Sequence, residues 1–117
     1  MNTHEKINYL EFPATDLNVV KTFFHTVFGW QFIDYGPDYT AFSGAGIDGG
    51  FYRADISARS SNGSVLVVFY SENLHHTQEK ITTAGGQLVK DIFEFPGGRR
   101  FHFADPTGNE YAVWSDK

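Results

Sequence analysis

The order of structural signals along this chain repeats itself, and this duplication constrains the fold more than any other feature of the sequence. A residue with a short polar side chain precedes each candidate helix: Asp16 in the first half and Asn73 in the second, 57 residues later. Gly29 and Gly86, which follow the two helices, are separated by the same 57 residues. A shift close to half of the 117 residues is expected when one βαβββ unit has been duplicated. The sequence therefore predicts two similar halves within one α+β domain.

The first half predicts one strand, one helix and three further short strands. Apolar and polar side chains alternate over residues 7–14, which is typical of a strand with two different faces. Thr15 or Asp16 supplies a side-chain oxygen for the free N–H groups at the start of a helix over residues 16–28. Gly29 favours the left-handed conformation that ends a helix. Three short strands between turn-forming residues are expected over residues 31–35, 39–43 and 49–53.

The second half repeats this order after a polar connection. Residues 54–64 are small and polar, so we expect them to run over the surface between the two halves. A strand over residues 65–70 follows, and Asn73 can cap a second helix over residues 73–84. The segment Asp105-Pro106-Thr107-Gly108 has the residue types that a type I turn prefers. The remaining strands are expected over residues 87–92, 99–104 and 110–114.

The composition fits a single packed domain over residues 1–117, with module one at about 5–53 and module two at about 65–115. The chain has twelve Phe, which favour an apolar interior, and no Cys, which excludes disulfides and thiolate chemistry. The nine Lys and Arg are scattered, and this disfavours a face that binds nucleic acid. No apolar run is long enough to cross a membrane. The polar first residues do not have the pattern of a signal peptide, which favours the cytoplasm.

Three segments resemble the vicinal oxygen chelate superfamily, which includes glyoxalase I, extradiol dioxygenases and bleomycin-resistance proteins. They are Asp16-Leu17 leading to Phe23-Phe24, the run Val27-Phe28-Gly29-Trp30, and the run Phe103-Ala104-Asp105-Pro106-Thr107-Gly108-Asn109. The resemblance covers nearly the whole chain. It implies two tandem βαβββ modules that form a concave mixed sheet around a cleft, and a homodimer that completes the cleft.

The same resemblance implies that this chain has lost the metal site of its metal-dependent relatives. Those relatives place a His or Gln seven residues before the Asp that opens the first helix, and here that position holds Tyr9. The corresponding position in the second half holds Leu66. Ala112 stands where the relatives place a Glu, and the counterpart in the first half falls near Tyr52 or Arg53. Because none of these supplies an imidazole or a carboxylate, we expect no metal and no cofactor.

Three titratable residues are candidates for catalysis: Glu11, His102 and Glu110. Strand alternation predicts that Glu11 points into the cleft and that Glu110 shares a face with Ala112 and Trp114. Two carboxylates in one cavity can hold a divalent ion or form an acid/base pair. Alternatively, each pairs with an Arg or a backbone N–H, or lies at the solvated rim of the cleft. His102 is either a general base or a hydrogen-bonded histidine within a sheet.

Aromatic residues are candidates for ligand binding. Alternation predicts that Tyr9, Tyr70 and Trp114 face the cleft, and Tyr52 belongs to the same group. Together with Glu11, these side chains suit a planar or cationic organic ligand. The alternative is that they pack in an ordinary core.

Arg99 and Arg100 follow a glycine-containing segment and precede a predicted strand. Two adjacent Arg side chains can grip a ligand carboxylate through their forks of N–H donors. The alternative is a solvated loop edge.

Three functions remain open from the sequence. The first is a metal-independent protein that binds an aromatic or cationic small molecule, as in the resistance branch of the superfamily. The second is a glyoxalase-like lyase or isomerase that uses Glu11, Glu110 or His102. The third is an interaction module whose cleft is filled by its own side chains. The absence of metal ligands favours the first function, which is not enzymatic.

Overall fold

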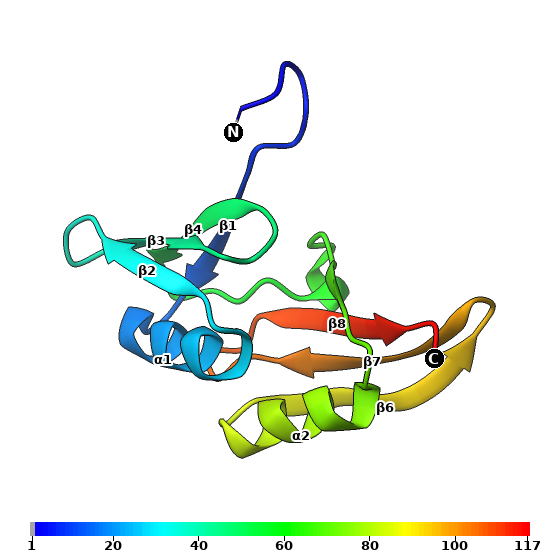
Figure 1. Cartoon of the computed structure of the whole chain (residues 1–117). Coiled ribbons are helices and arrows are strands. Elements are labelled where there is room, and N and C mark those ends of the chain that lie inside the picture. Colours follow the sequence, from blue (N-terminus) through cyan, green and yellow to red (C-terminus); the bar gives the residue numbers. More distant parts are fainter. Residues whose placement is uncertain (1) are drawn as a thin grey trace.

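The computed structural model describes residues 2–117 and contains two βαβββ modules in tandem (Figure 1). Module one consists of β1 (Tyr9–Ala14), α1 (Leu17–Phe28), β2 (Gln31–Asp34), β3 (Tyr39–Ser43) and β4 (Asp48–Arg53). The Asp16 side chain accepts a hydrogen bond from the Val19 N–H at 3.2 Å and begins α1, as predicted. Gly29 ends the helix at φ 75°, a left-handed conformation that residues with a Cβ rarely adopt.

Module two consists of β5 (Val67–Tyr70), α2 (Leu74–Thr83), β6 (Gln87–Phe95), β7 (Gly98–Ala104) and β8 (Glu110–Ser115). Asn73 caps α2 by accepting a hydrogen bond from the His76 N–H at 3.1 Å. The predicted turn between β7 and β8 is closed by the Gly108 N–H, which donates to the Asp105 carbonyl at 2.8 Å. Among residues 2–117, no helix has the length and apolar character that crossing a membrane requires.

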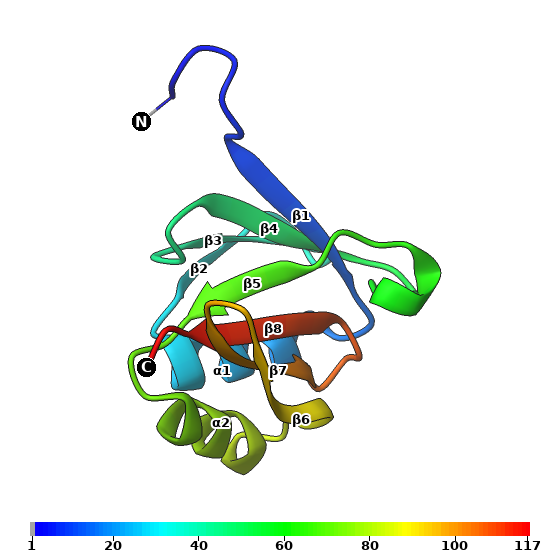
Figure 2. The same ribbon diagram turned by 90° about the vertical axis from the view of Figure 1, so that its right-hand side faces the viewer.

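The eight strands form two separate sheets, one in each module. Their strand orders are β1-β4-β3-β2 and β5-β8-β7-β6. In both sheets the first strand pairs in parallel with the last, and the other pairs are antiparallel. The equal orders confirm the predicted α+β fold of two tandem modules. Residues 54–64 connect the sheets and contain a short 3-10 helix, η1 (Ser60–Asn62), which lies beside the start of β8 (Figure 2).

β6 is longer than the sequence predicted, since it continues to Phe95. Pro96 and Gly97 form a tight hairpin turn between β6 and β7, and Phe95 pairs directly with Gly98. The register between β6 and β7 also shifts twice along the strand. These shifts break the alternation of apolar and polar residues from which a strand is identified in sequence.

An aromatic core holds the two modules together. Phe24 of α1 is fully buried, and its ring stacks on Trp30 with centroids 4.5 Å apart. The same ring contacts Tyr111 of β8 edge-on at 5.3 Å. Phe23, the preceding residue, contacts Phe103 of β7 at 6.2 Å. Because α1 lies below the first sheet and contacts the second through these rings, it joins both halves (Figure 1).

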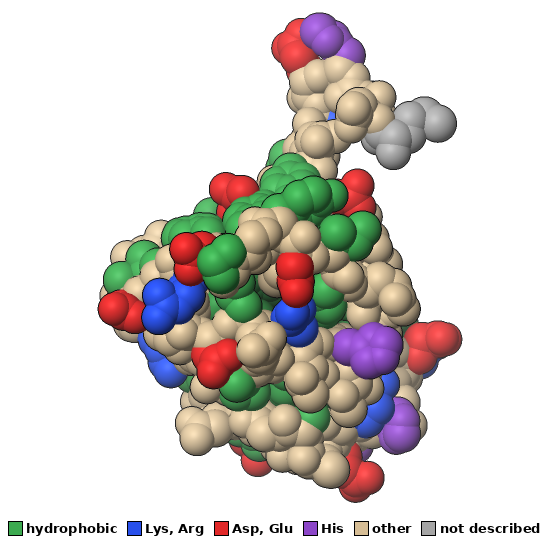
Figure 3. All heavy atoms as spheres, turned by 90° about the vertical axis from the view of Figure 1, so that its left-hand side faces the viewer, with side chains coloured by type: hydrophobic (Ala, Val, Ile, Leu, Met, Phe, Trp, Pro, Cys, Tyr) green, Lys and Arg blue, Asp and Glu red, His purple; other side chains and the backbone are tan. Residues whose placement is uncertain are grey.

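The outer face of each sheet, which points away from this core, carries exposed aromatic residues. Tyr9 and Tyr52 on the first sheet are 42% and 37% exposed, and Tyr70 on the second is 48% exposed. Figure 3 shows hydrophobic side chains gathered on the upper part of the molecule, with acidic side chains around them. Exposed groups of large apolar side chains often mark binding surfaces.

Candidate functional site

Three side chains on the outer face of the first sheet form a hydrogen-bonded group that we term the tyrosine–glutamate cluster: Tyr9, Glu11 and Tyr39. The Tyr39 hydroxyl donates to Glu11 Oε2 at 2.9 Å and lies 2.6 Å from the Tyr9 hydroxyl. Gly50 makes this contact possible, because β4 lies between β3 and β1 in the sheet. A Cβ added at Gly50 would lie 2.2 Å from the Tyr39 hydroxyl oxygen. The glycine therefore lets the Tyr39 side chain cross β4.

The hydrogen bonds within this cluster leave a carboxylate charge at its end. Because the Tyr39 hydroxyl donates its hydrogen to Glu11, the Tyr9 hydroxyl must be the donor in the hydrogen bond between the two phenols. Burial, together with the hydrogen bonds to Tyr9 and Glu11, raises the pKa of Tyr39 far above its ordinary value, so this hydroxyl keeps its proton. Within residues 2–117, no Lys, Arg or His forms an ion pair with Glu11. The Glu11 charge is therefore available to a ligand.

A second group, on the outer face of the second sheet, links Ser60, Glu110, His102 and Arg100. The Ser60 N–H and hydroxyl both donate to Glu110 Oε1, at 2.9 and 2.8 Å. Glu110 Oε2 lies 3.1 Å from His102 Nδ1. His102 Nε2 lies 3.2 Å from Arg100 Nε and 3.0 Å from Arg100 Nη2. We term this group the arginine–histidine–glutamate chain.

The donors and acceptors along the arginine–histidine–glutamate chain determine the tautomer of the His102 imidazole. A guanidinium has only N–H donors, so His102 Nε2 must accept from Arg100 and cannot carry a proton. Nδ1 then carries the proton and donates to Glu110. Burial alone would raise the pKa of Glu110, but hydrogen bonds from Ser60 and His102 outweigh it and lower the pKa of this carboxyl. The chain therefore holds a carboxylate, a neutral imidazole and a guanidinium.

Aromatic rings surround the Arg100 end of the chain. The guanidinium carbon lies 5.9 Å from the centroids of both Phe93 and Phe95. Phe95 contacts Trp114 with centroids 6.3 Å apart, and Trp114 contacts Tyr70 at 5.2 Å. Phe95, Trp114 and Tyr70 therefore form a continuous row of rings next to a cation, and Phe93 lies beside the same guanidinium.

Tyr70, at the far side of this patch, is oriented by a hydrogen bond. Its hydroxyl donates to Asp116 Oδ1 at 2.5 Å. This hydrogen bond is the main cause of a raised pKa of Tyr70, and burial adds to the effect. The phenol of Tyr70 therefore stays protonated at neutral pH, and its ring is held beside Trp114.

The structure places the candidates from the sequence in two groups rather than one. Tyr9, Glu11 and Tyr52 lie on the first sheet, and Tyr70 and Trp114 lie on the second. Glu11 and Glu110 likewise belong to different sheets, and each has its own hydrogen-bond partners. His102 has the geometry of the hydrogen-bonded sheet histidine, because both of its ring nitrogens are occupied.

Two members of these groups, Tyr39 and Ser60, were not found from the sequence. The adjacent Gly49 and Gly50 are the signal that could have located Tyr39, since glycines inside a strand indicate close approach of another group. No sequence signal identifies Ser60, which reaches Glu110 only because the connection between the modules passes beside β8.

The donor atoms do not fit the metal site of the vicinal oxygen chelate superfamily. At the expected ligand positions, Tyr9 offers a phenol that is bonded to Tyr39, while Leu66 and Ala112 offer only carbon. In the part of the chain that the structure describes, no three His, Cys, Asp or Glu side chains come together as a possible metal group. Tight sites for zinc or similar ions need such sets of nitrogen, sulfur or carboxylate donors.

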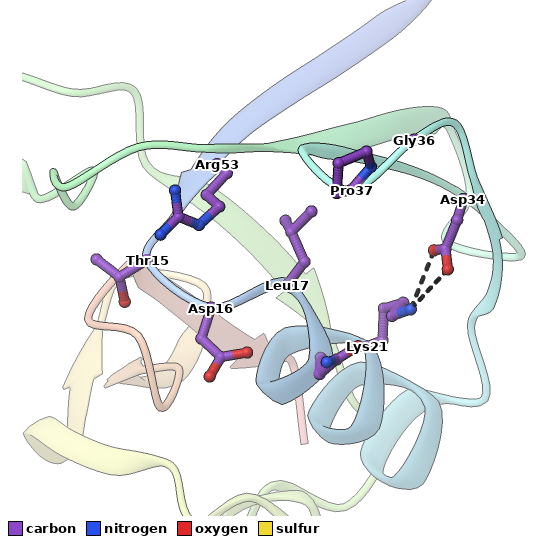
Figure 4. Close-up of a pocket in the computed structure, with 9 residues that line it drawn as sticks. Thr15, Asp16, Leu17, Lys21, Asp34, Gly36, Pro37 and Arg53 are labelled. Carbon is purple, nitrogen blue, oxygen red and sulfur yellow. Dashed lines mark hydrogen bonds and ion pairs between the residues drawn. The ribbon is translucent and has the colours of Figure 1, made fainter.

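Of the pockets in the described chain, two are relevant here because charged or aromatic side chains line them. The larger, of about 420 Å³, is formed by the start of α1, the β2–β3 turn and Arg53 (Figure 4). Its charged side chains are partly engaged, since Lys21 Nζ lies 3.0 Å from both carboxylate oxygens of Asp34. A second pocket, of about 340 Å³, lies between the first sheet and β5, has mostly apolar walls and includes Tyr70. Its volume is at the lower end of the range for small-molecule sites.

Sequence comparison gives one clear match. The sequence model of the Glyoxalase/Bleomycin resistance protein/Dioxygenase superfamily matches residues 6–113. A search of curated proteins found no match.

Several solved structures share this fold at low sequence identity. The fosfomycin resistance protein FosX from Listeria monocytogenes is 18% identical, with a TM-score of 0.78 over 97% of this chain and 94% of its own. TioX from Micromonospora sp. ML1 is 16% identical, with a TM-score of 0.72 over 96% of this chain and 99% of its own. A glyoxalase/bleomycin resistance protein/dioxygenase family enzyme from Burkholderia phytofirmans PsJN is 16% identical, with a TM-score of 0.77 over 94% of this chain and 98% of its own. Identities this low show the fold alone.

Proposed function

Because the chain belongs to the Glyoxalase/Bleomycin resistance protein/Dioxygenase superfamily, we propose that it binds a small aromatic or cationic molecule without a metal. The observation that carries this proposal is the tyrosine–glutamate cluster. It presents the exposed phenol ring of Tyr9 and the half-buried ring of Tyr39 beside a carboxylate that forms no ion pair within residues 2–117. Aromatic faces and an unpaired carboxylate attract organic cations by cation–π and Coulomb interactions.

The proposal that no metal takes part rests on the side chains at the family positions. A mutant of the Listeria FosX has been solved in complex with Mn(II) and 1S,2S-dihydroxypropylphosphonic acid. In this chain, the corresponding positions named by the superfamily pattern hold Tyr9, Leu66 and Ala112. A hydrogen-bonded phenol and two hydrocarbon side chains do not replace imidazole and carboxylate ligands.

The geometry supports a glyoxalase-like enzyme less well than it supports a binding protein. A general base needs a free lone pair within reach of its substrate. His102 has none, because Nε2 accepts from Arg100 and Nδ1 donates to Glu110. Glu110 is only 7% exposed, and its two oxygens are bonded to Ser60 and His102. Of the three candidates for catalysis, only Glu11 is exposed.

A homodimer is part of the proposal. Large apolar side chains outside the two binding groups are exposed, including Ile7, Ile33 and Val65. β1 and β5 also stand at open sheet edges. A second copy would cover such surfaces, as symmetric dimers commonly do. Cytoplasmic location stays a prediction from the sequence.

A cationic aromatic probe tests the proposal. Benzyltrimethylammonium at about 100 times its Kd is expected to stabilise the protein by about 2.7 kcal/mol, which a thermal unfolding experiment detects. Glu11→Gln is expected to weaken this binding about tenfold, because it removes the carboxylate charge but keeps the shape. The matched control Glu79→Gln removes an equal charge from the exposed face of α2 and should leave the affinity unchanged. Equal affinities for the two variants would contradict the proposed site.

A further inference from the structure

Arg100 has hydrogen-bond donors that no group in the described chain uses. Its Nε and Nη2 atoms donate to His102, and this occupies one edge of the guanidinium. Nη1 forms no hydrogen bond with any atom of residues 2–117, and Nη2 has a second N–H. These two nitrogens form the end of the guanidinium fork, which matches the two oxygens of a carboxylate.

The guanidinium is also held in place before any ligand arrives. His102 accepts from two of its nitrogens, and Glu110 fixes His102 from the other side of the imidazole ring. Ser60 in turn fixes Glu110 through two hydrogen bonds. A preorganised donor loses less conformational entropy on binding than a flexible surface side chain does.

The surroundings of Arg100 are cationic and aromatic. Lys90 Nζ lies 5.7 Å from the centroid of the Phe93 ring, over which Arg100 also lies. In the described part of the chain, neither Lys90 nor Arg100 forms an ion pair with a carboxylate. Their charges are therefore not neutralised directly, and Phe95 and Trp114 extend the aromatic surface beside them.

We propose that the outer face of the second sheet binds the oxyanion of an aromatic acid. The free end of the Arg100 fork holds the anionic group, Lys90 adds a second positive charge, and the aromatic ring of the ligand packs against Phe95, Trp114 and Tyr70. This inference rests on the proposed function, because it assumes that the outer sheet faces bind small molecules. It deepens that function by assigning an acid to the second sheet, while the tyrosine–glutamate cluster of the first sheet suits a cation.

The test is a titration of wild-type protein with benzoate, phenylphosphonate and neutral benzamide, followed by NMR of the Trp114 indole N–H. We expect at least one of the two acids to shift this resonance and to bind about tenfold or more tightly than benzamide. Comparing benzoate with phenylphosphonate shows whether the site prefers a planar carboxylate or a tetrahedral phosphonate. Arg100→Gln is expected to weaken the binding of the preferred acid about tenfold or more.

Arg99→Gln is the matched control, because it removes the same charge from the adjacent residue. Arg99 donates to the Lys117 carbonyl rather than to His102, and it lies on the opposite side of the strand by alternation. Equal losses in Arg99→Gln and Arg100→Gln would overturn the inference, as would binding of benzamide as tightly as the acids. If neither acid binds but benzyltrimethylammonium does, this inference fails and the proposed function stands. If none of the probes binds, both fail.

Discussion

Replacing Phe24 by alanine is expected to lower the free energy of unfolding by about 3–5 kcal/mol. The Phe24 ring is fully buried, and it contacts Trp30 and Phe51 of module one and Tyr111 of module two. Its removal leaves a cavity where the two modules meet, and neighbouring aromatic rings are too rigid to fill it. At about 4–8 °C for each kcal/mol, thermal unfolding should show a decrease in Tm of more than about 10 °C.

The control for this variant is on the same helix. Val19→Ala truncates a side chain that is 36% exposed, so it should change stability by less than about 1 kcal/mol. A Phe24→Ala variant as stable as Val19→Ala would show that α1 does not join the two modules as described.

Replacing Asn109 by alanine is expected to cost about 2–5 kcal/mol of stability. Asn109 is fully buried, and its side-chain amide donates to the Pro13 carbonyl of β1 at 2.7 Å. Its amide oxygen accepts from the Ala58 N–H at 2.8 Å. Alanine leaves both of these backbone groups without a partner. A buried unpaired group costs about 1–3 kcal/mol, and the half-buried Ala58 N–H costs less than a fully buried one. Urea unfolding monitored by tryptophan fluorescence measures the loss.

A control variant and a hydrogen-exchange measurement test whether the effect is specific to the hydrogen bonds of Asn109. Asn18→Ala changes an exposed residue of α1 and should alter stability by less than about 0.5 kcal/mol. Hydrogen exchange should also show that Asn109→Ala loosens the connection over residues 54–64, because the Ala58 N–H loses its acceptor. Unchanged protection of Ala58 in this variant would contradict the role that we assign to Asn109.

The elements of the fold that depend on local chemistry could be predicted from the sequence. The caps at Asp16 and Asn73, the left-handed Gly29 and the turn that starts at Asp105 each act within a few residues. Because these signals recur after about half the chain, they also revealed the duplication. The length of β6 could not be predicted, since it depends on pairing with β7 and on shifts of register along that pair.

The candidate site could be predicted only in part, for the same reason. Alternation along one strand was sufficient to predict that Glu11 and Tyr9 share a face, although it placed that face in a cleft. The contact between Tyr39 and Glu11 spans β4 and depends on the register of three strands around Gly50. The position of Arg100 against His102 likewise depends on side-chain conformation, and the link to Ser60 depends on the path of the connection. The contacts of Tyr39 and Ser60 are long-range, and the contact of Arg100 depends on a side-chain conformation; a residue pattern specifies neither.

A metal analysis combined with one titration tests whether this chain binds its ligand without a metal. Purified protein is analysed for bound metals and then titrated with benzyltrimethylammonium in three conditions: untreated, with EDTA, and with added Mn²⁺ or Zn²⁺. Because Tyr9, Leu66 and Ala112 do not supply metal ligands, we predict no stoichiometric transition metal and the same Kd in all three conditions. One tightly bound zinc, nickel, manganese or iron ion per chain, together with loss of binding in EDTA, would contradict the account.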